Sequence, residues 1–322
     1  MIVMITTRGN GYTLRTLAKG TFGVPVPTFR LTHYERLLRC WHVPRATYIF
    51  GDIERLAPWE LRLAADLYRS MTEAGLRCLN DPARALSRLA LLRGLHHADI
   101  NPFNAYRADE QPRPERFPVF VRHEDDHLRA AADLYHDQDE LDRALAKLAN
   151  SGLPLRGMLV VEYCPAPYRD GLWAKWGSWR IGDAVFVDHL VVDDTWLVKV
   201  GDPAKLTEQE KRDERDALDT NRYEGPVGRA FEVGGIDFGR ADHADIDGRP
   251  VIYEINTNPF TPRFTPGPNP AASETTMKIR NRFSEALEAI DTPSGGRVKI
   301  APTPRRRPIR WWRPGFVTPR RP

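Results

Sequence analysis

The sequence predicts a mixed fold in which an α/β lobe with a small parallel sheet is followed by two α+β lobes. Strand-like and helix-like segments alternate over the first hundred residues, which is typical of parallel strands joined through helices. Further along, strands are joined by hairpin turns. The 322 residues suffice for several lobes. We therefore expect an N-terminal α/β domain at 1–98, lobes at 99–185 and 186–292, and a basic disordered tail at 293–322.

The N-terminal lobe is predicted from three short apolar runs and two helical stretches between and after them. The runs MIVMITT, ATYIFGDI and LRCL end near residues 7, 53 and 79 and have the length of buried strands. A helical pattern covers 58–74, and a second helix carries the segment ALSRLALLRGL. This alternation predicts a small parallel sheet with helices on its faces.

The segment after residue 99 begins with the strand FPVFVR, at 117–122, and an amphipathic helix. Asp137 or Asp139 is suited to cap that helix, and Gly152 follows its end. The apolar positions of the helix keep a spacing of three and four residues: Leu141, Ala144, Leu145, Leu148 and Ala149.

The second half of the chain reads as hairpins accompanied by helices. The strand GMLVVEYC precedes WRIGDAVFVDHLVV, at 179–192, whose Gly-Asp pair predicts a turn. A charged helix follows near 206–219, and a final helix covers 272–291. These elements predict two α+β lobes after the first domain.

The bulk composition is that of a globular protein, with 41% hydrophobic and 28% charged residues. No apolar run reaches the ~18 residues of a membrane span, and the N-terminus lacks the pattern of a signal peptide. We therefore expect a cytoplasmic protein. The three cysteines are far apart, which argues against a disulfide framework or a zinc knot.

The stretch VIYEINTNP, at 251–259, places two oxygen-bearing side chains within an apolar strand. Because side chains alternate along a strand, Glu254 and Asn256 are expected on one face and Val251, Tyr253 and Ile255 on the other. Such a strand can pack on one side and hold a ligand on the other.

A third oxygen ligand is expected from the preceding strand. Asp247 and Gly248 predict a tight hairpin turn. With a two-residue turn, Asp237 falls diagonal to Asn256 and on the same face of the ladder as Glu254. Two carboxylates and an amide oxygen are ligands suited to Mg²⁺ or Mn²⁺, with phosphate oxygens filling the remaining positions. The metal site is therefore predicted at Asp237, Glu254 and Asn256.

Several segments between about 75 and 265, taken together with this pattern, resemble the ATP-grasp superfamily and its peptide-ligase-like branch. The resemblance implies two lobes enclosing ATP and assigns a basic phosphate contact to Arg88 and another to Arg122. VVEYC is similar to the segment that meets the adenine, which implies nucleotide contacts from Glu162, Tyr163, Cys164 and also Lys175. The strands carrying Arg180, His189 and Lys199 resemble those that follow, and we assign Arg180 and Lys199 to the reacting groups.

The chain departs from the pattern of this superfamily at three places. Lysine usually stands where this chain has Arg88 and Arg122, and HEDDH replaces the glycine-rich loop expected after the second of them. Related ligases often carry an arginine two residues before the metal aspartate, a position that Gly235 would occupy here. Arg240 or Arg263 is the replacement that we consider, and Arg240 is our choice for a catalytic role.

The resemblance implies an ATP-dependent ligase that activates a small-molecule carboxylate as an acyl phosphate and joins it to an amine. One alternative is a kinase that phosphorylates a small-molecule hydroxyl group with the same metal site. Another is a nucleotide-binding protein without catalysis, because both lysines are replaced and the loop is absent.

Two further motifs suggest other functions. HEDDH, at 123–127, matches the H-E-x-x-H pattern of zinc peptidases, but a strand runs directly into it. The last thirty residues carry nine Lys and Arg and no acid, so the rest of the chain is at −5 against a total of +4. Arginines interleaved with Trp311 and Trp312 could bind nucleic acid or an anionic membrane surface, and a solvated flexible tail is the alternative.

Overall fold

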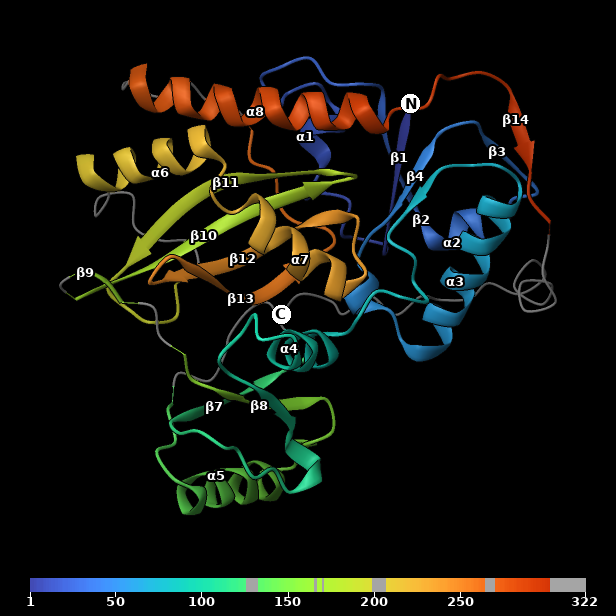
Figure 1. Cartoon of the computed structure of the whole chain (residues 1–322). Helices are drawn as coiled ribbons and strands as arrows, with labels where there is room; N and C mark the ends of the chain where they lie inside the picture. The colour runs from blue at the N-terminus through green and yellow to red at the C-terminus, as the bar shows by residue number, and fades with distance from the viewer. Residues whose placement is uncertain (126–132, 165–166, 170, 199–206, 264–269, 302–322) are drawn as a thin grey trace.

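The computed structural model of the chain describes residues 1–125, 133–164, 167–169, 171–198, 207–263 and 270–301. Its elements form three sheets of three or more strands with helices packed on them, seen from one side in Figure 1. The predicted mixture of a parallel lobe and antiparallel lobes is confirmed. No helix in the described part of the chain is both long and apolar enough to cross a bilayer.

The N-terminal lobe is a parallel four-stranded sheet in the order β2-β1-β4-β5. Its strands are β1 (Ile2–Thr6), β2 (Phe29–His33), β4 (Thr47–Phe50) and β5 (Cys78–Leu79). One face packs on helix α3 (Pro58–Glu73), through the buried residues Leu63, Ala64, Leu67 and Met71. The short elements α1 (Arg15–Ala18), α2 (Tyr34–Leu37), β3 (His42–Pro44) and the 3₁₀ turn η1 (Ile53–Arg55) complete the lobe.

The small lobe contains the antiparallel strands β6 (Ala105–Arg107), β8 (Met158–Glu162) and β7 (Val119–His123), in that spatial order. Helix α5 (Gln138–Asn150) lies along this sheet at the lower end of the view in Figure 1, and the 3₁₀ turn η2 (Ala108–Glu110) follows β6. The side chain of Asp137 accepts a hydrogen bond from the backbone N–H of Glu140 at 2.8 Å, so the predicted cap is confirmed.

The large lobe is built on a sheet in the order β11-β10-β12-β13, with β9 (Pro167–Arg169) paired to β10. Its long strands are β10 (Leu172–Ile181), β11 (Ala184–Asp193), β12 (Phe238–Ile246) and β13 (Arg249–Asn256). The helices around it are α4 (Arg88–His97), α6 (Glu208–Thr220), α7 (Glu224–Gly234) and α8 (Pro270–Ile290).

The two faces of this large sheet are covered differently. One face packs on α4, α6 and α7 through a continuous apolar cluster that includes Leu95, Ala217 and Phe231. At one end of the opposite face, Trp179 and Phe238 pack against α8 and against the N-terminal sheet. The remainder of this opposite face carries polar side chains and borders the cleft described below.

Two of the expected boundaries are corrected by the sheet topology. Residue 185 lies inside the β10–β11 hairpin, so both strands belong to the large lobe, and the small-lobe sheet ends with β8. The expected disordered tail begins with β14 (Arg297–Lys299), which pairs antiparallel with β3 of the N-terminal lobe. Residues 302–322, with the tryptophans of the basic tail, lie outside the described residues.

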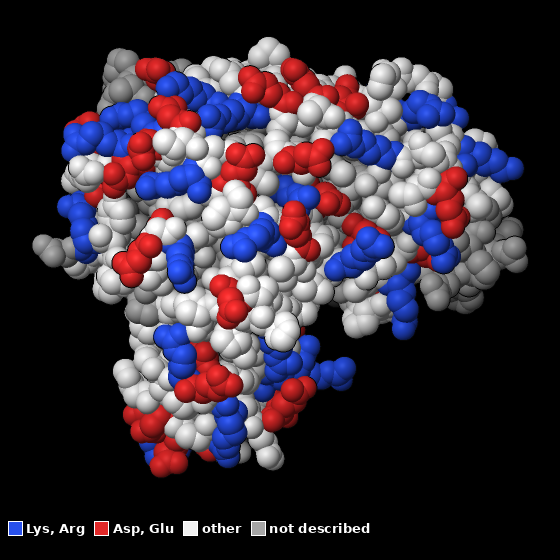
Figure 2. Space-filling view, viewed as in Figure 1, with Lys and Arg blue, Asp and Glu red and all other residues white. Residues whose placement is uncertain are grey.

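On the face shown in Figure 2, basic and acidic side chains alternate without a large field of one sign.

Candidate active site

A cleft of about 660 Å³ lies where all three lobes meet. This volume is in the range of pockets that enclose small-molecule ligands. The small lobe and the segment after β8 line it with Phe103, Phe120, Arg122, Tyr163 and Cys164. The large sheet contributes Lys175, Arg240, Asp242, Glu254 and Asn256, and the N-terminal lobe contributes Tyr12, Thr13, Glu54 and Arg55.

Three oxygen-bearing side chains of β12 and β13 line this cleft together. Asp242 is directly opposite Glu254 in the antiparallel ladder, and Asn256 is opposite Arg240. Residues opposite each other in such a ladder point to the same face. The amide nitrogen of Asn256 donates to Oε1 of Glu254 at 3.2 Å. Asp242, Glu254 and Asn256 therefore form a compact set of oxygen donors on the cleft wall.

Asp237, the aspartate expected from the sequence, does not belong to this set. It precedes β12, accepts a hydrogen bond from the backbone N–H of Asn80 at 3.3 Å and lies 3.9 Å from a guanidinium nitrogen of Arg180. The register that we assumed from the Asp-Gly turn holds as far as His243 but shifts between His243 and Asp242. The shift is a bulge, and it brings Asp242 opposite Glu254.

The same bulge changes the expected alternation of β13. Tyr253 lines the cleft, as Glu254 does, while Ile252 and Ile255 pack in the apolar cluster on the opposite face. Val251 packs with residues of α4 and the small lobe. Val251, Tyr253 and Ile255 thus do not share one face, because the extra residue interrupts the period of two.

Four basic side chains are paired with the two carboxylates. Arg88 forms an ion pair with Glu254 and also donates to the backbone oxygen of Glu124 at 2.7 Å. Arg122 lies 3.9 Å from the same carboxylate. Lys175 and Arg240 lie 3.1 Å and 3.5 Å from the carboxylate oxygens of Asp242. The cleft wall is therefore an alternating array of charges.

Arg240 is held from behind by an acid on the neighbouring hairpin. Its Nη1 lies 3.3 Å from the carboxylate of Asp188, which also pairs with Nδ1 of His189 at 2.7 Å. Burial alone would raise the pKa of Asp188, but the charge and hydrogen bond of His189 and the charge of Arg240 lower it to about 2. Asp188 therefore stays ionised and fixes the guanidinium of Arg240.

Arg240 stands two residues before Asp242. That is the spacing noted in the resemblance between the arginine and the metal aspartate, so the sequence also offers Asp242 as a candidate for that aspartate. The sequence-based pairing, counted from the Asp247-Gly248 turn without a bulge, did not place Asp242 opposite Glu254.

The segment expected to meet the adenine does line the cleft, but its carboxylate serves the small lobe. Glu162 is buried, and both of its carboxylate oxygens accept hydrogen bonds at 2.9–3.1 Å, from Tyr106 Oη and from three backbone N–H groups. Tyr163 and Cys164 line the cleft, and Trp196 packs against Tyr163 and Phe120 with ring centroids 5.0 Å and 5.2 Å away. This corner offers aromatic faces and backbone groups.

One of the expected reacting groups, Arg180, is not among the described residues that line the cleft. Arg180 lies on the opposite face of β10 from Lys175, and its Nε donates to the backbone oxygen of Gly182 at 3.0 Å. Lys199 lies outside the described residues. In the HEDDH motif, His123 ends strand β7 and Glu124 lies 3.5 Å from Arg107. Its last two residues are outside the described part, and its first three are not helical.

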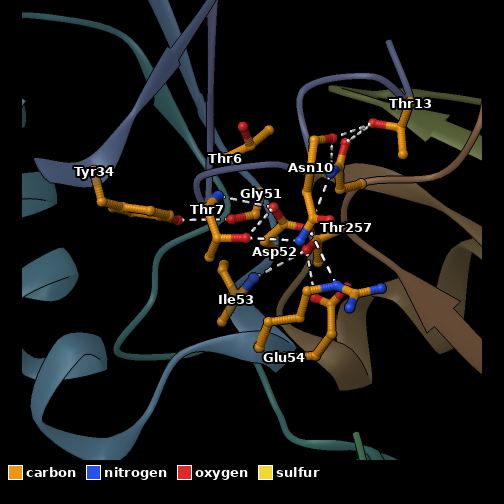
Figure 3. Close-up of polar contacts among 12 residues, drawn as sticks. Thr6, Thr7, Asn10, Thr13, Tyr34, Gly51, Asp52, Ile53, Glu54 and Thr257 are labelled. Atoms are coloured by element: carbon orange, nitrogen blue, oxygen red, sulfur yellow. Dashed lines mark hydrogen bonds and ion pairs between the residues drawn. The ribbon is translucent and has the colours of Figure 1, made fainter. Parts of the chain in front are cut away.

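The N-terminal lobe is tied to the end of β13 by a network of hydrogen bonds (Figure 3). Asp52 accepts from the backbone N–H and hydroxyl of Thr7 at 2.8 Å and 2.9 Å and from the amide of Asn258 at 2.9 Å. Asn258 in turn accepts from the hydroxyl of Thr13 at 2.5 Å. Because Asn258 is two residues beyond Asn256, the network fixes the loop edge of the N-terminal sheet beside the oxygen donors.

No protein-family profile and no curated protein matches the chain. Among solved structures, the chain is similar to the D-alanine–D-alanine ligase from Bacillus anthracis complexed with ATP, with 11% identity, 90% of this chain and 97% of that chain covered, and a TM-score of 0.47. It is also similar to a RimK domain protein from Sphaerobacter thermophilus, described as ATP-grasp, with 16% identity, 89% and 100% coverage, and a TM-score of 0.45. The residues of this chain itself carry the functional argument that follows.

Proposed function

We propose that this chain is an ATP-grasp enzyme that uses ATP to join a small-molecule carboxylate to an amine. The observation that carries the proposal is the array on the cleft wall, where Asp242, Glu254 and Asn256 present oxygen donors among four basic side chains. Acidic and amide oxygens beside fixed cations suit a triphosphate with its divalent ion. The sequence resemblance supports the same superfamily.

The residues of the cleft fit a magnesium ion by their chemistry. Asp242, Glu254 and Asn256 offer the hard oxygen donors that Mg²⁺ prefers. Within the described part of the chain, Oδ1 of Asp242 is buried and has no hydrogen-bond partner, although Nε of Arg240 lies 3.5 Å away, so this oxygen can still take a ligand. Bound at these residues, Mg²⁺ would neutralise phosphate charge during transfer.

The basic side chains have distinct tasks in this proposal. Arg88 and Arg122 come from α4 and β7 and reach Glu254, so they can bind phosphate oxygens beside it. Lys175 approaches Asp242 from the neighbouring strand β10, and Arg240 lies two residues before Asp242 on β12 itself. Held by Asp188, the guanidinium of Arg240 is a fixed positive charge suited to the oxygen that becomes negative when the amine attacks the acyl phosphate.

The aromatic corner completes the nucleotide site. Trp196, Phe120 and Tyr163 offer ring faces to a purine base, and the backbone of Tyr163 and Cys164 lies along the same corner. Glu162 is assigned no contact with the nucleotide, because its carboxylate is already hydrogen-bonded within the small lobe and holds this segment in place.

The proposal is tested by measuring ADP release from Mg·ATP by the full chain. Pools of the twenty amino acids and of simple carboxylic acids are added together and singly, and the products are identified by mass spectrometry. We expect release of ADP that depends on one acid and one amine, with an amide as the product, and background release by Asp242→Asn. A stable phosphate ester would instead indicate a kinase, and release no greater than that of Asp242→Asn with every pool would contradict the proposal.

A further inference from the structure

Glu54 brings a carboxylate of the N-terminal lobe into the cleft. It lies in the turn η1, which begins three residues after the end of β4, and lines the same 660 Å³ cleft as Glu254 and Asn256. Together with Arg88, Glu124 and Glu254, it also borders a smaller hollow beside that cleft. None of the nucleotide and metal contacts proposed above uses this residue.

The other described carboxylates of the cleft are ion-paired or fully hydrogen-bonded, and Glu54 is neither. Asp242 and Glu254 are each paired with two cations. The carboxylate of Glu162 is fully hydrogen-bonded by neutral donors. Over the residues that the structure describes, no Lys, Arg or His forms an ion pair with Glu54, and Arg55 pairs instead with Asp52 at 3.4 Å. Among the described carboxylates of this cleft, Glu54 thus has neither an ion pair nor the full set of hydrogen-bond donors that Glu162 has, although the charge of Arg55 acts on it.

Glu54 is nevertheless held in a fixed position. Its Oε2 accepts a hydrogen bond from the hydroxyl of Thr257 at 2.6 Å, and that hydroxyl accepts from the backbone N–H of Ile53 at 3.3 Å (Figure 3). Thr257 directly follows Asn256. The carboxylate is therefore anchored next to the end of the strand that carries two of the oxygen donors.

The surroundings favour a positively charged ligand at this carboxylate. Burial and the charge of Asp52 raise the pKa of Glu54, because both disfavour its ionised form. A cation bound beside it would offset that cost. Tyr12, Pro259 and Phe260 line the same cleft and can cover the apolar part of a small ligand.

We propose that Glu54 binds the ammonium group of the amine substrate, so that the acceptor is a primary amine which enters the cleft protonated. The inference rests on the proposed function in taking the amine as the acceptor. It adds that the N-terminal lobe selects this acceptor by its charge, while the large lobe and the small lobe hold the nucleotide.

The first test measures binding without turnover. Saturation-transfer NMR is recorded on ethylammonium chloride, with ethanol as the neutral counterpart, in the presence of the full chain. Glu54→Gln keeps an oxygen that can accept from Thr257 and removes the charge. Glu73→Gln, at an exposed acid of the same lobe, is the matched control. We expect transfer to ethylammonium with the wild type and the control, and a loss of about tenfold in affinity with Glu54→Gln.

The second test uses the acid and amine identified by ADP release. Glu54→Gln should raise the KM for the amine by about tenfold and leave the KM for ATP unchanged. Equal binding of ethylammonium by Glu54→Gln and the wild type, no binding by the wild type, or an unchanged KM for the amine would each overturn the role of Glu54. Failure of the proposed function is distinguishable, because it appears as absent ADP release while the NMR result still stands.

Discussion

The two faces of the β9–β13 sheet are made by the same strands and have opposite characters. On the cleft face, Lys175, Arg240, Asp242, Glu254 and Asn256 form a charged array. One residue further along each strand, the side chains enter the apolar cluster under α7, as Ala241 and Ile255 do. Because side chains alternate along a strand, the charged residues lie on the cleft face and the apolar residues pack on the other face. A single bulge between β12 and β13 determines which residues face the cleft.

The largest expected effect comes from removing the central acid of the cleft face. Glu254→Ala should lower ATP-dependent turnover by about a thousandfold, because Arg88 and Arg122 lose this ion-pair partner and the proposed metal site loses a carboxylate. Ile255→Val, at the next position but on the other face, should leave turnover within about twofold and cost about 1 kcal/mol of stability. ADP release and thermal unfolding are measured for both variants. Similar losses of turnover in the two variants would contradict the different roles assigned to the two faces of the sheet.

The next effect distinguishes the two aspartates at and before β12. Asp242→Asn should lower turnover by roughly several hundredfold, because Asp242 faces Glu254 and pairs with Lys175. Asp237→Asn should change turnover by less than about twofold, because Asp237 contacts Asn80 and Arg180 and is not among the described residues that line the cleft. Steady-state kinetics at saturating Mg·ATP provides the measurement. A greater loss from Asp237→Asn than from Asp242→Asn would restore the assignment made from the sequence.

The third prediction concerns pH, because each face holds a group with a lowered pKa that titrates in acid: His243 on the α7 face and Asp188 on the cleft face. Burial lowers the pKa of His243, on the α7 face, to about 4, so the folded protein keeps this histidine neutral. Since the unfolded chain takes up the proton near pH 6.5, the unfolding free energy should fall by about 3 kcal/mol as the pH is lowered from 6.5 to 4. His243→Phe should remove this dependence.

The cleft face responds at lower pH. Asp188 has its pKa lowered to about 2, so its contribution to stability is complete above about pH 4 and is lost as the pH falls towards 2. Denaturant titrations at closely spaced pH values separate the two windows. An unchanged slope between pH 6.5 and 4 in His243→Phe would show that another group causes the loss.

The smallest effect concerns the packing of His189 on the cleft face. A Cβ on Gly177 would lie 2.6 Å from Cε1 of His189, so Gly177→Ala must displace the imidazole. We expect a loss of about 1 kcal/mol in the unfolding free energy. Gly225→Ala, in α7 with open space around it, should instead leave the stability unchanged or slightly raise it. Equal melting temperatures for the two variants would contradict this packing argument.

Much of the fold follows from local pattern in the sequence. The strand at 2–6, helix α3, helix α5 with its Asp137 cap and the β10–β11 hairpin lie within a few residues of the predicted segments. Each is specified by residues close together in the chain: apolar spacing, a capping side chain or a turn pair. The edge strand β2 and helix α7 were not predicted, because β2 alternates weakly and α7 contains Gly and Pro.

Part of the candidate site was also predictable, because some of its residues lie close together in the chain. Glu254 and Asn256 lie two positions apart on one strand, and the structure places both in the cleft together with Arg122, Lys175 and Arg240. The position of Asp242 opposite Glu254 was missed, because it depends on a bulge that the turn sequence does not reveal. Glu54 was missed because nothing near it in the sequence indicates that the end of β4 borders the cleft.

The sequence by itself determined most of the long helices and strands and the presence of oxygen-bearing side chains beside basic residues. Only the tertiary structure decided the register of β12 against β13, the covering of one face by α4, α6 and α7, and the approach of Glu54 to Thr257. The physical reason is the range of the interactions. Periodicity and turns act between neighbours in the chain, whereas register and lobe contacts are set by packing and hydrogen bonds between residues as far apart as Asp52 and Asn258.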